Sequence, residues 1–374
     1  MEIIKMNRLR EGNMDNTVGI LTFIATINYG AEFQAYALVR AVREMGYCAE
    51  LVNYTCPKIA DQETPKLIRN NEEFSLSSFA RNLLKYPSQR ERQRRFREFS
   101  SSKIQLGRIM RGAQDILDSY RYIVVGSDQV WSSKITGGDG TFLLDGKRHE
   151  GQRLVSYAAS FGDSYPDPGG RQRLSRELSK FDRISVREES GLAVLEQLGI
   201  AGGTTTIDPT LLLSKENWSE IAAPNNKDSY VFAYAVAEGR STLEYARRVA
   251  NEFGMELRYI SAYGSRPLPH AKNCGSCSPS HFLSLIRDAA FVVTSSFHGM
   301  CFSILFNKQF RFAFAGDKGT SRLCSLAEKL GISAYDISNC DFDDKIDYCM
   351  VDKLLEDLRN ESKEWLKASL YFQG

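Results

Sequence analysis

A histidine lies within residues 289–306, AAFVVTSSFHGMCFSILF, where an apolar run is interrupted by a small polar turn and then resumes. The Val- and Phe-rich run before the turn predicts a buried parallel strand, and Gly299 to Phe306 predict a buried helix. His298 is therefore expected at the carboxyl end of a strand and beside a helix N-terminus, where open α/β sheets bind ligands and unpaired N–H groups suit an anion. A histidine enclosed in a core is the alternative, and the small polar turn favours a functional one.

An acidic residue follows a second predicted strand. Residues 122–126, Tyr-Ile-Val-Val-Gly, predict this strand, which places Asp128 at its carboxyl end with Gln129 beside it. A helix-capping role for Asp128 and contact of its carboxylate with substrate hydroxyls are both compatible with this position. The sequence leaves the two open.

An arginine follows a third predicted strand. Residues 183–186 form a short β-type run, and Arg187 comes directly after it and ahead of a helix. Arg187 is expected at the same sheet edge as the polar turns described above. Pairing with Glu188 or Glu189 and contact with an anion are equally compatible with this place, because a guanidinium suits a carboxylate or a phosphate.

The start of the chain predicts a further helix N-terminus at this edge. Residues 18–24 predict a strand, apolar residues at helical spacing follow and stop at Gly46, and residues 49–54 predict a second strand. Together they form a βαβ unit. The turn Asn28, Tyr29 and Gly30 has one glycine where a dinucleotide fingerprint has three, so we interpret it as suited to a phosphate or a sugar hydroxyl.

Residues 89–97, QRERQRRFR, are strongly basic and predict part of a helix. A solvated helix face explains such a segment. We favour that explanation, and a patch that meets anionic lipid headgroups or a diphosphate-linked acceptor is the alternative.

Two cysteines form the sequence Cys-Gly-Ser-Cys in a predicted loop, at Cys274 and Cys277. His270 and His281 flank the pair. Four ligands at such short spacings would crowd one loop, so we expect free thiols rather than a zinc or redox site.

The composition is that of an ordinary soluble globular protein. The chain has 374 residues, of which 43% are hydrophobic and 25% charged, and its formal net charge is +2, so no global charge points to nucleic acid. His298 and its neighbours interrupt the longest apolar run before it reaches the length of a membrane helix. Residues 1–16 are too polar for a signal peptide. We expect a cytoplasmic location, free or peripheral at the inner face of the membrane.

The length predicts two domains, because a single core seldom exceeds about 250 to 300 residues. Pro209 after Asp208 favours an extended crossing in residues 204–213, and we place the boundary after residue 214. Residues 1–214 and 215–368 are each predicted to form an α/β, Rossmann-like domain. The last five residues, LYFQG, match the end of a common engineered protease site, and we assign residues 369–374 to a tag remnant.

From about residue 18 to 332, the chain resembles the polysaccharide pyruvyl transferase family. The motifs that carry the resemblance are NYGAEFQAYAL (28–38), VVGSDQVW (124–131), SVRE (185–188), IDPTLLL (207–213), SPSHFLSLIRDAAFVVTSSFHG (278–299) and SRLCSLAEKLGI (321–332). Each motif is modest alone, and their order and spacing make the match specific.

The resemblance implies two Rossmann-like domains facing a cleft, as in glycosyltransferase-B-like enzymes, and formation of a pyruvate ketal on a sugar of a polysaccharide precursor with phosphoenolpyruvate as donor. The family's essential histidine matches His298, and some members carry arginine where this chain has Ser296. The expected residues are His298 and Asp128 for catalysis, Arg187, Arg322, Ser296 and Gly299 for the donor, and Asn28, Tyr29, Gly30 and Gln129 for the acceptor.

The chemistry of this reaction suits these residue types. Protonation of the CH₂ carbon of the enol phosphate requires an acid, which an imidazolium can supply near neutral pH. Guanidinium groups match the donor's carboxylate and phosphate. We expect the N-terminal domain to bind a sugar or lipid-linked oligosaccharide acceptor and the C-terminal domain to bind phosphoenolpyruvate, with no metal, other cofactor or nucleic acid.

Two other functions fit the same architecture. A nucleotide-sugar-dependent glycosyltransferase would bind a nucleoside diphosphate between the domains. A non-catalytic binding protein would keep the fold without turnover. Binding of phosphoenolpyruvate and not of nucleotide sugars would distinguish a pyruvyl transferase from the glycosyltransferase. Phosphate release on adding an acceptor would exclude the non-catalytic binding protein.

Overall fold

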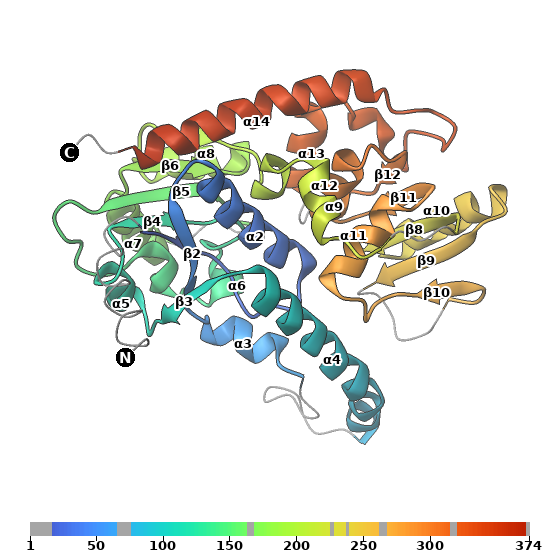
Figure 1. The fold of residues 1–374 in the computed structure, drawn as a ribbon, viewed down its shortest axis with the longest axis horizontal. Coiled ribbons are helices and arrows are strands. Elements are labelled where there is room, and N and C mark those ends of the chain that lie inside the picture. Colours follow the sequence, from blue (N-terminus) through green and yellow to red (C-terminus); the bar gives the residue numbers. More distant parts are fainter. Residues whose placement is uncertain are drawn as a thin grey trace, which may run out of the picture.

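The computed structural model describes residues 17–65, 76–162, 168–224, 228–236, 239–261, 268–314 and 320–371. Within these residues the chain forms two α/β halves, each built on a parallel sheet (Figure 1). This is the predicted glycosyltransferase-B-like architecture of two Rossmann-like units.

The N-terminal sheet has the strand order β3-β2-β1-β4-β5-β6-β7. Its central strands are apolar and buried, as expected of parallel strands covered by helices on both faces, whereas the edge strand β3 is largely exposed and was not predicted. The strands are β1 (Thr17–Leu21), β2 (Cys48–Asn53), β3 (Leu106–Ile109), β4 (Tyr122–Val125), β5 (Arg153–Ala159), β6 (Arg183–Val186) and β7 (Thr204–Thr205).

The C-terminal sheet has the strand order β10-β9-β8-β11-β12, also parallel. The predicted boundary after residue 214 falls between β7 and the first strand of this sheet, and it stays a prediction. The strands are β8 (Tyr230–Ala235), β9 (Glu256–Ser261), β10 (Ala271–Asn273), β11 (Phe291–Thr294) and β12 (Phe310–Phe312).

Helices connect and cover the strands. The α-helices are α2 (Tyr29–Glu44), α3 (Pro57–Glu63), α4 (Leu76–Lys103), α5 (Ala113–Leu117), α6 (Ser133–Thr136), α7 (Pro168–Leu178), α8 (Glu189–Gln197), α9 (Lys215–Ile221), α10 (Gly239–Glu252), α11 (Pro279–Arg287), α12 (Phe297–Leu305), α13 (Thr320–Lys329) and α14 (Tyr348–Leu370). Short 3₁₀ helices are η2 (Gly140–Leu143), η3 (Pro209–Leu212) and η4 (Ser333–Tyr335). The extended crossing predicted before residue 214 is therefore partly the turn η3, in which Pro209 occupies the first position.

An aromatic interface cluster joins the two halves. Tyr29 and Phe33 on α2 meet Phe282 on α11, and Phe33 also meets Trp218 on α9 and Phe302 on α12. The rings of Tyr29 and Phe282 stack with centroids 4.3 Å apart, and all five side chains are fully buried. One continuous apolar core thus includes residues of both halves, which fixes how the two sheet edges face each other.

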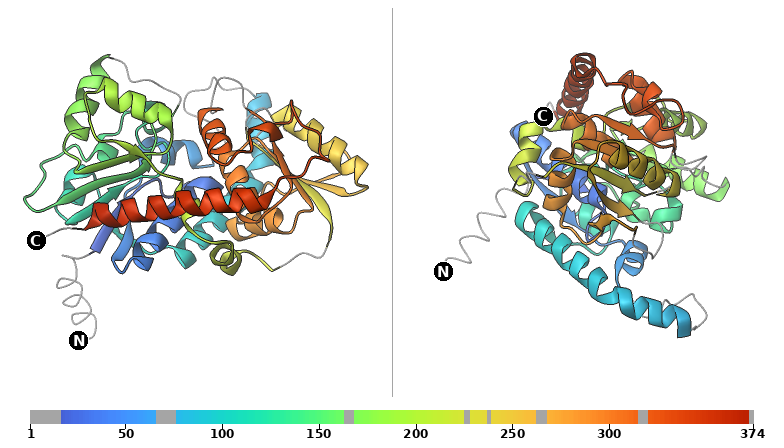
Figure 2. Two further views of the ribbon diagram at one scale, coloured as in Figure 1. Left: turned by 90° about the horizontal axis from the view of Figure 1, so that it is seen from above. Right: turned by 90° about the vertical axis from the view of Figure 1, so that its right-hand side faces the viewer.

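The last helix, α14, runs across both halves (Figure 2). At its start the Tyr348 hydroxyl donates to the Ser303 carbonyl, 3.2 Å away, in the C-terminal half. At its end the Arg153 side chain on β5 donates to the Ser369 carbonyl at 2.8 Å. Ser369 and Leu370 are buried in this last turn, and the assignment of residues 369–374 to a tag remnant stays a prediction.

None of the helices in the described part of the chain is both long enough and apolar enough to cross a bilayer.

Phe282→Ala tests the aromatic interface cluster. Loss of a fully buried ring that contacts both halves should cost about 3 to 5 kcal/mol of stability, because the cavity cannot collapse without moving one half against the other. Thermal unfolding followed by circular dichroism measures it. Phe253→Ala, at a ring that is 37% exposed, is the matched control and should cost clearly less. Equal losses for the two variants would contradict this account of the interface.

Candidate active site

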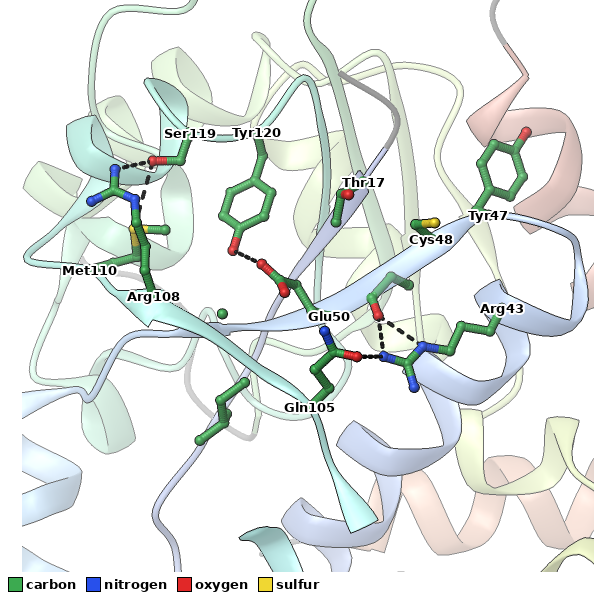
Figure 3. Close-up of a pocket in the computed structure, with 13 residues that line it drawn as sticks. Thr17, Arg43, Tyr47, Cys48, Glu50, Gln105, Arg108, Met110, Ser119 and Tyr120 are labelled. Carbon is green, nitrogen blue, oxygen red and sulfur yellow. Dashed lines mark hydrogen bonds between the residues drawn. The ribbon is translucent and has the colours of Figure 1, made fainter. Parts of the chain in front are cut away.

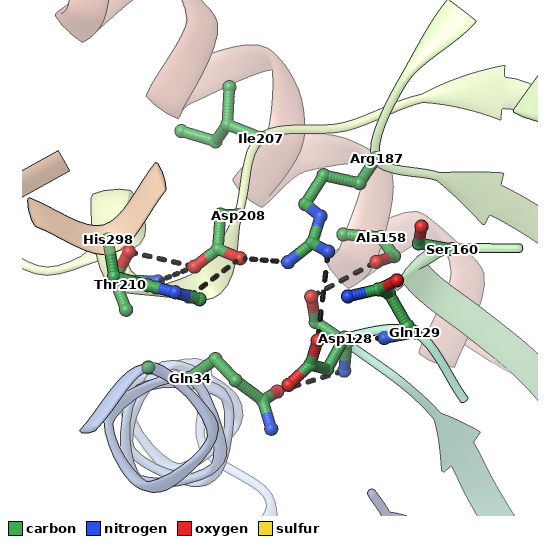
Figure 4. Close-up of polar contacts among 12 residues, drawn as sticks. Gln34, Asp128, Gln129, Ala158, Ser160, Arg187, Ile207, Asp208, Thr210 and His298 are labelled. Atoms are coloured by element: carbon green, nitrogen blue, oxygen red, sulfur yellow. Dashed lines mark hydrogen bonds and ion pairs between the residues drawn. The ribbon is translucent and has the colours of Figure 1, made fainter. Parts of the chain in front are cut away.

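A buried carboxylate lies at the centre of the candidate site, on Asp208 in the segment between β7 and η3 (Figure 4). Its Oδ1 accepts from the backbone N–H and the hydroxyl of Thr210, at 3.0 and 2.7 Å. Its Oδ2 lies 2.9 Å from Nη1 of Arg187 and 3.6 Å from Nε2 of His298. One carboxylate therefore contacts a cationic group of the N-terminal half and an imidazole of the C-terminal half.

His298 lies where the sequence predicted it, after β11 and in the first turn of α12. Its imidazole packs against Gly30 in the first turn of α2, and a Cβ at Gly30 would overlap the ring. The glycine is thus required for the approach of the two halves rather than for a special backbone angle. Asp208 on one side and Gly30 on the other fix the position of the imidazole.

Arg187 follows β6, and its side chain is almost completely buried. Besides Asp208, the guanidinium faces Glu188 at 3.6 Å and Asp128 at 3.7 Å, and it lies 5.1 Å from the centroid of the Phe297 ring. The predicted alternative partner Glu189 instead pairs with Lys329. One guanidinium is therefore surrounded by three carboxylates.

The charges of this cluster shift its titration. Burial alone would raise the pKa of Asp208, but His298, Arg187 and the Thr210 amide outweigh it and hold that pKa well below its usual range. Burial alone would lower the pKa of Arg187, and the surrounding carboxylates raise it instead. Asp208 is therefore a carboxylate, and Arg187 a cation, throughout the working range of pH.

Several polar atoms of this cluster are buried without a hydrogen bond among the described residues. They are Nε and Nη2 of Arg187, Oε2 of Glu188 and Nε2 of His298. Buried polar groups are nearly always hydrogen-bonded in folded proteins, so a group of unpaired ones points to a ligand. The donors of Arg187 and the ring nitrogen of His298 would then contact that ligand from two sides.

Asp128 joins the same cluster, from the turn that follows β4. Its backbone lies in the left-handed region, with φ of 72°, which Asp tolerates better than most residues. Oδ1 accepts from the Gln129 N–H at 2.8 Å. Buried Gln34 on α2 holds the turn, because its Oε1 accepts from the Ser127 N–H at 3.1 Å and its Nε2 donates to Thr22 at 2.8 Å.

A family model described as polysaccharide pyruvyl transferase matches residues 28–317. The match covers most of the chain and spans every residue of the cluster described above. The chain belongs to the polysaccharide pyruvyl transferase family. The resemblance inferred from the sequence is confirmed, and membership supports a transferase of polysaccharide biosynthesis.

Three solved structures are similar to this chain over most of its length at low sequence identity. A UDP-GlcNAc 2-epimerase from Neisseria meningitidis bound to UDP-GlcNAc is 9% identical, with a TM-score of 0.48 and coverage of 95% of this chain and 99% of that one. A putative UDP-N-acetylglucosamine 2-epimerase from Listeria monocytogenes is 11% identical, with a TM-score of 0.45 and coverage of 94% and 90%. Medicago truncatula UGT71G1 complexed with UDP-glucose is 10% identical, with a TM-score of 0.45 and coverage of 96% and 99%. No curated protein matches the sequence significantly.

In this pyruvyl transferase family member, two expected donor contacts have local structural roles. Ser296 is the N-cap of α12, and its side chain accepts from the Gly299 N–H at 3.4 Å. Gly299 lies so close to Thr294 that a side chain would not fit. The Gly299 amide is thus used by the cap, and both residues act by fixing the helix that carries His298.

The expected acceptor residues also have structural roles. Asn28 caps α2, accepting from the Gly30 N–H at 2.9 Å, and Gln129 is half-buried with its amide against Gly162. Tyr29 corrects the prediction, because its side chain is fully buried and its hydroxyl donates to the Cys277 carbonyl at 2.9 Å. Tyr29 joins the two halves and has no surface left for an acceptor.

Arg322, the second expected donor anchor, lies in the first turn of α13 and is partly buried. Asp208, Glu188 and Gln34 are members of the site that the sequence analysis did not assign. Asp208 had a local explanation as the cap of a turn before proline, which hid its contacts with Arg187 and His298.

A cavity of about 660 Å³ lies at the other end of the N-terminal sheet, where β1 and β2 begin (Figure 3). Its charged side chains already have partners. Glu50 accepts from the Tyr120 hydroxyl at 2.8 Å, Arg108 donates to Ser119 at 2.5 Å, and Arg43 donates to the Gln105 side chain at 2.8 Å. Size alone does not make this cavity a site, and none of the expected residues lines it.

Cys274 and Cys277 are free thiols. Burial raises the pKa of Cys277 to about 12, so this thiol is not a reactive thiolate at neutral pH. No three His, Cys, Asp or Glu side chains come together in a metal-binding arrangement in the described residues.

Asp208→Asn tests the central carboxylate. Removing one partner of a buried ion pair should cost about 3 kcal/mol or more. Because the pKa of Asp208 is lower in the folded than in the unfolded chain, the stabilisation is complete above about pH 5 and is lost as the pH falls below about 4. The difference in melting temperature between native protein and variant should therefore be constant from pH 5 to 8 and shrink below pH 4.

Asp118→Asn, at a half-exposed carboxylate paired with His149, is the control for this measurement. It should change the melting temperature far less than Asp208→Asn does, because an exposed ion pair contributes little to stability. An Asp208→Asn variant as stable as this control would contradict the role of Asp208.

Proposed function

We propose that this protein transfers the pyruvyl group of phosphoenolpyruvate to two hydroxyls of an acceptor sugar, forming a pyruvate ketal and releasing phosphate. The observation that carries the proposal is that Nε and Nη2 of Arg187 and Nε2 of His298 are buried in one cluster without a hydrogen bond, each with a carboxylate only at 3.6 to 3.7 Å. A ligand with a carboxylate and a phosphate would supply charge-assisted hydrogen bonds to them. Membership of the pyruvyl transferase family supports the reaction class.

The reaction needs one acid and leaves no charge unbalanced. His298, protonated at Nε2, gives its proton to the CH₂ carbon of the donor, which becomes a methyl group while C2 becomes electrophilic. One sugar hydroxyl attacks C2 and a second displaces phosphate, so two C–O bonds to the sugar replace the C=C π bond and the C–O bond to phosphate. One hydroxyl proton replenishes His298, and the other leaves with phosphate. Asp128 is proposed to orient the acceptor hydroxyl.

Further contacts complete the proposal. Arg322, at the start of α13, is proposed as the second anchor of the donor. The positive charge comes from side chains, so the scheme requires no metal or other cofactor.

The proposed acceptor is a sugar or a lipid-linked oligosaccharide, met by a cytoplasmic enzyme with peripheral contact to the membrane. Helix α4 supports the membrane contact, because it projects from the body of the molecule and its sequence has eight basic and two acidic residues (Figure 1). Leu83 and Leu84 on this helix are 51% and 84% exposed. Exposed leucines with basic neighbours suit an anionic membrane surface.

His298→Gln tests the proposed acid. The amide keeps the size of the side chain but cannot donate the proton, so kcat should fall at least about a hundredfold while donor affinity changes little. Phosphate release from phosphoenolpyruvate in the presence of acceptor measures it. His281→Gln, at an exposed imidazole on α11, is the control and should keep the native rate. Near-native turnover by a folded His298→Gln variant would refute the assignment.

Arg187→Lys tests the donor anchor. Charge is kept but the planar fork is lost, so the affinity for phosphoenolpyruvate should fall about tenfold or more. The rise in melting temperature on adding phosphoenolpyruvate, relative to each variant without ligand, measures the affinity. Arg94→Lys, on the exposed face of α4, is the control.

Two results would overturn this assignment. One is an unchanged response to phosphoenolpyruvate in both Arg187→Lys and Arg322→Lys. The other is stabilisation of the native protein by nucleotide sugars and not by phosphoenolpyruvate, which would favour a glycosyltransferase.

A further inference from the structure

A second cavity, of about 200 Å³, lies beside the candidate active site at the carboxyl ends of β1 and β2. In the strand order β2-β1-β4, it occupies one side of β1 and the Asp208 cluster lies beyond the other. Its walls are mainly apolar, formed by Leu51 from β2 and by Phe96 and Ile104 from the second half of α4 and its end. The proposed function uses none of its residues.

Polar groups converge in this cavity from α2, α4 and the β1–α2 loop. Glu32 on α2 lines it, is only 4% exposed, and accepts from the Ser100 hydroxyl on α4 at 2.5 Å. No cationic side chain of the described residues forms an ion pair with this carboxyl. Thr26, beside it, is also buried, and its hydroxyl has no hydrogen bond of ordinary geometry in the described structure.

The carboxyl of Glu32 is partly neutral at physiological pH. Burial raises the pKa of Glu32 to about 7, against smaller lowering by the Ser100 and Thr26 hydroxyls. A neutral carboxyl can donate one hydrogen bond and accept others, which a carboxylate cannot. Burying such a group without a cation destabilises the fold, and a cavity next to it indicates that the group serves a ligand.

We propose that this cavity binds a neutral sugar unit through the carboxyl of Glu32 and the hydroxyl of Thr26. Vicinal hydroxyls donate and accept in the way these two groups require, and the mainly apolar lining of the cavity suits the less polar face of a sugar. An anion would be repelled when Glu32 ionises. A cation would meet Arg97 at the rim of the cavity.

The proposal rests on the proposed function in one respect, because it assigns the sugar to the acceptor. Both sites lie at the carboxyl edge of one sheet, and the β1–α2 loop separates them. An oligosaccharide acceptor would present one sugar to His298 and a neighbouring sugar to Glu32. The cavity then determines which acceptors are used and takes no part in the chemistry.

Glu32→Leu and Thr26→Val remove the polar groups and keep the approximate shape, whereas Glu32→Gln keeps hydrogen bonding without charge. Saturation-transfer NMR with the methyl glycosides of glucose, galactose and N-acetylglucosamine measures binding without any donor or turnover. We expect at least one glycoside to bind the native protein, with affinity lost tenfold or more in the Leu and Val variants and kept within about threefold in Glu32→Gln. Glu50→Gln, at the carboxyl in the opposite cavity, is the matched control.

The melting temperature checks folding of the variants. Because the folded pKa of Glu32 exceeds the ordinary value near 4, its contribution to stability is lost as the pH rises through about 7. Glu32→Gln should therefore melt higher than the native protein at pH 8, with a smaller difference at pH 5.

Three results would overturn the proposal. The first is no saturable binding of any of the glycosides to the native protein, and the second is native affinity in a folded Glu32→Leu variant. The third is binding of glucosamine alone that is lost in Glu32→Gln, which would indicate a cation site. Failure of the Arg187→Lys and His298→Gln experiments with intact glycoside binding would reject the proposed reaction and leave the sugar site standing. Pyruvyl transfer with a native acceptor KM in Glu32→Leu would reject the sugar site alone.

Discussion

The active cluster depends on one buried carboxylate oxygen. Oδ2 of Asp208 faces Arg187 of the N-terminal half and His298 of the C-terminal half, so the two side chains come together only when both sheet edges are held at a fixed separation. The aromatic interface cluster and α14 hold that separation, and Gly30 permits it because any side chain there would overlap the imidazole. Packing between the halves is therefore a condition of the chemistry.

The same cluster lowers the stability of the folded state. Charges taken out of water are compensated only where the geometry is close, and Arg187 has one carboxylate at hydrogen-bonding distance and two farther away. The buried atoms of Arg187, Glu188 and His298 that have no hydrogen bond add to this cost. Proteins retain such arrangements mainly at functional sites, where a ligand completes them. The cost of the cluster and its proposed function thus have one origin.

The sequence predicted the fold well where burial governs it. β4 and β11 are apolar runs, and β5 and β6 are short, mostly buried β-type runs, so their positions, and those of Asp128, Arg187 and His298 after strand ends, followed from pattern alone. The edge strands β3 and β10 are largely exposed and lack this pattern. The roles of Asp208 and Tyr29 were not predicted, for a different reason. Their decisive partners lie far away in the chain, at His298 and Cys277, and local sequence patterns carry no information on such contacts.

Two carboxyl groups at one sheet edge acquire opposite properties from their surroundings. Asp208 is buried with a guanidinium, an imidazole and a backbone amide, which outweigh burial and keep it ionised. Glu32 is equally buried but has only hydroxyls as neighbours, which do not outweigh burial, so its proton is held to about neutral pH. Residue type alone does not distinguish them, since the environment sets the charge. An ionised carboxylate suits the positioning of cationic groups around an anionic donor, and a neutral carboxyl suits a sugar hydroxyl. The carboxyl edge of the N-terminal sheet thereby separates, within one layer of strands, the part of the molecule that organises charge from the part that meets an uncharged ligand.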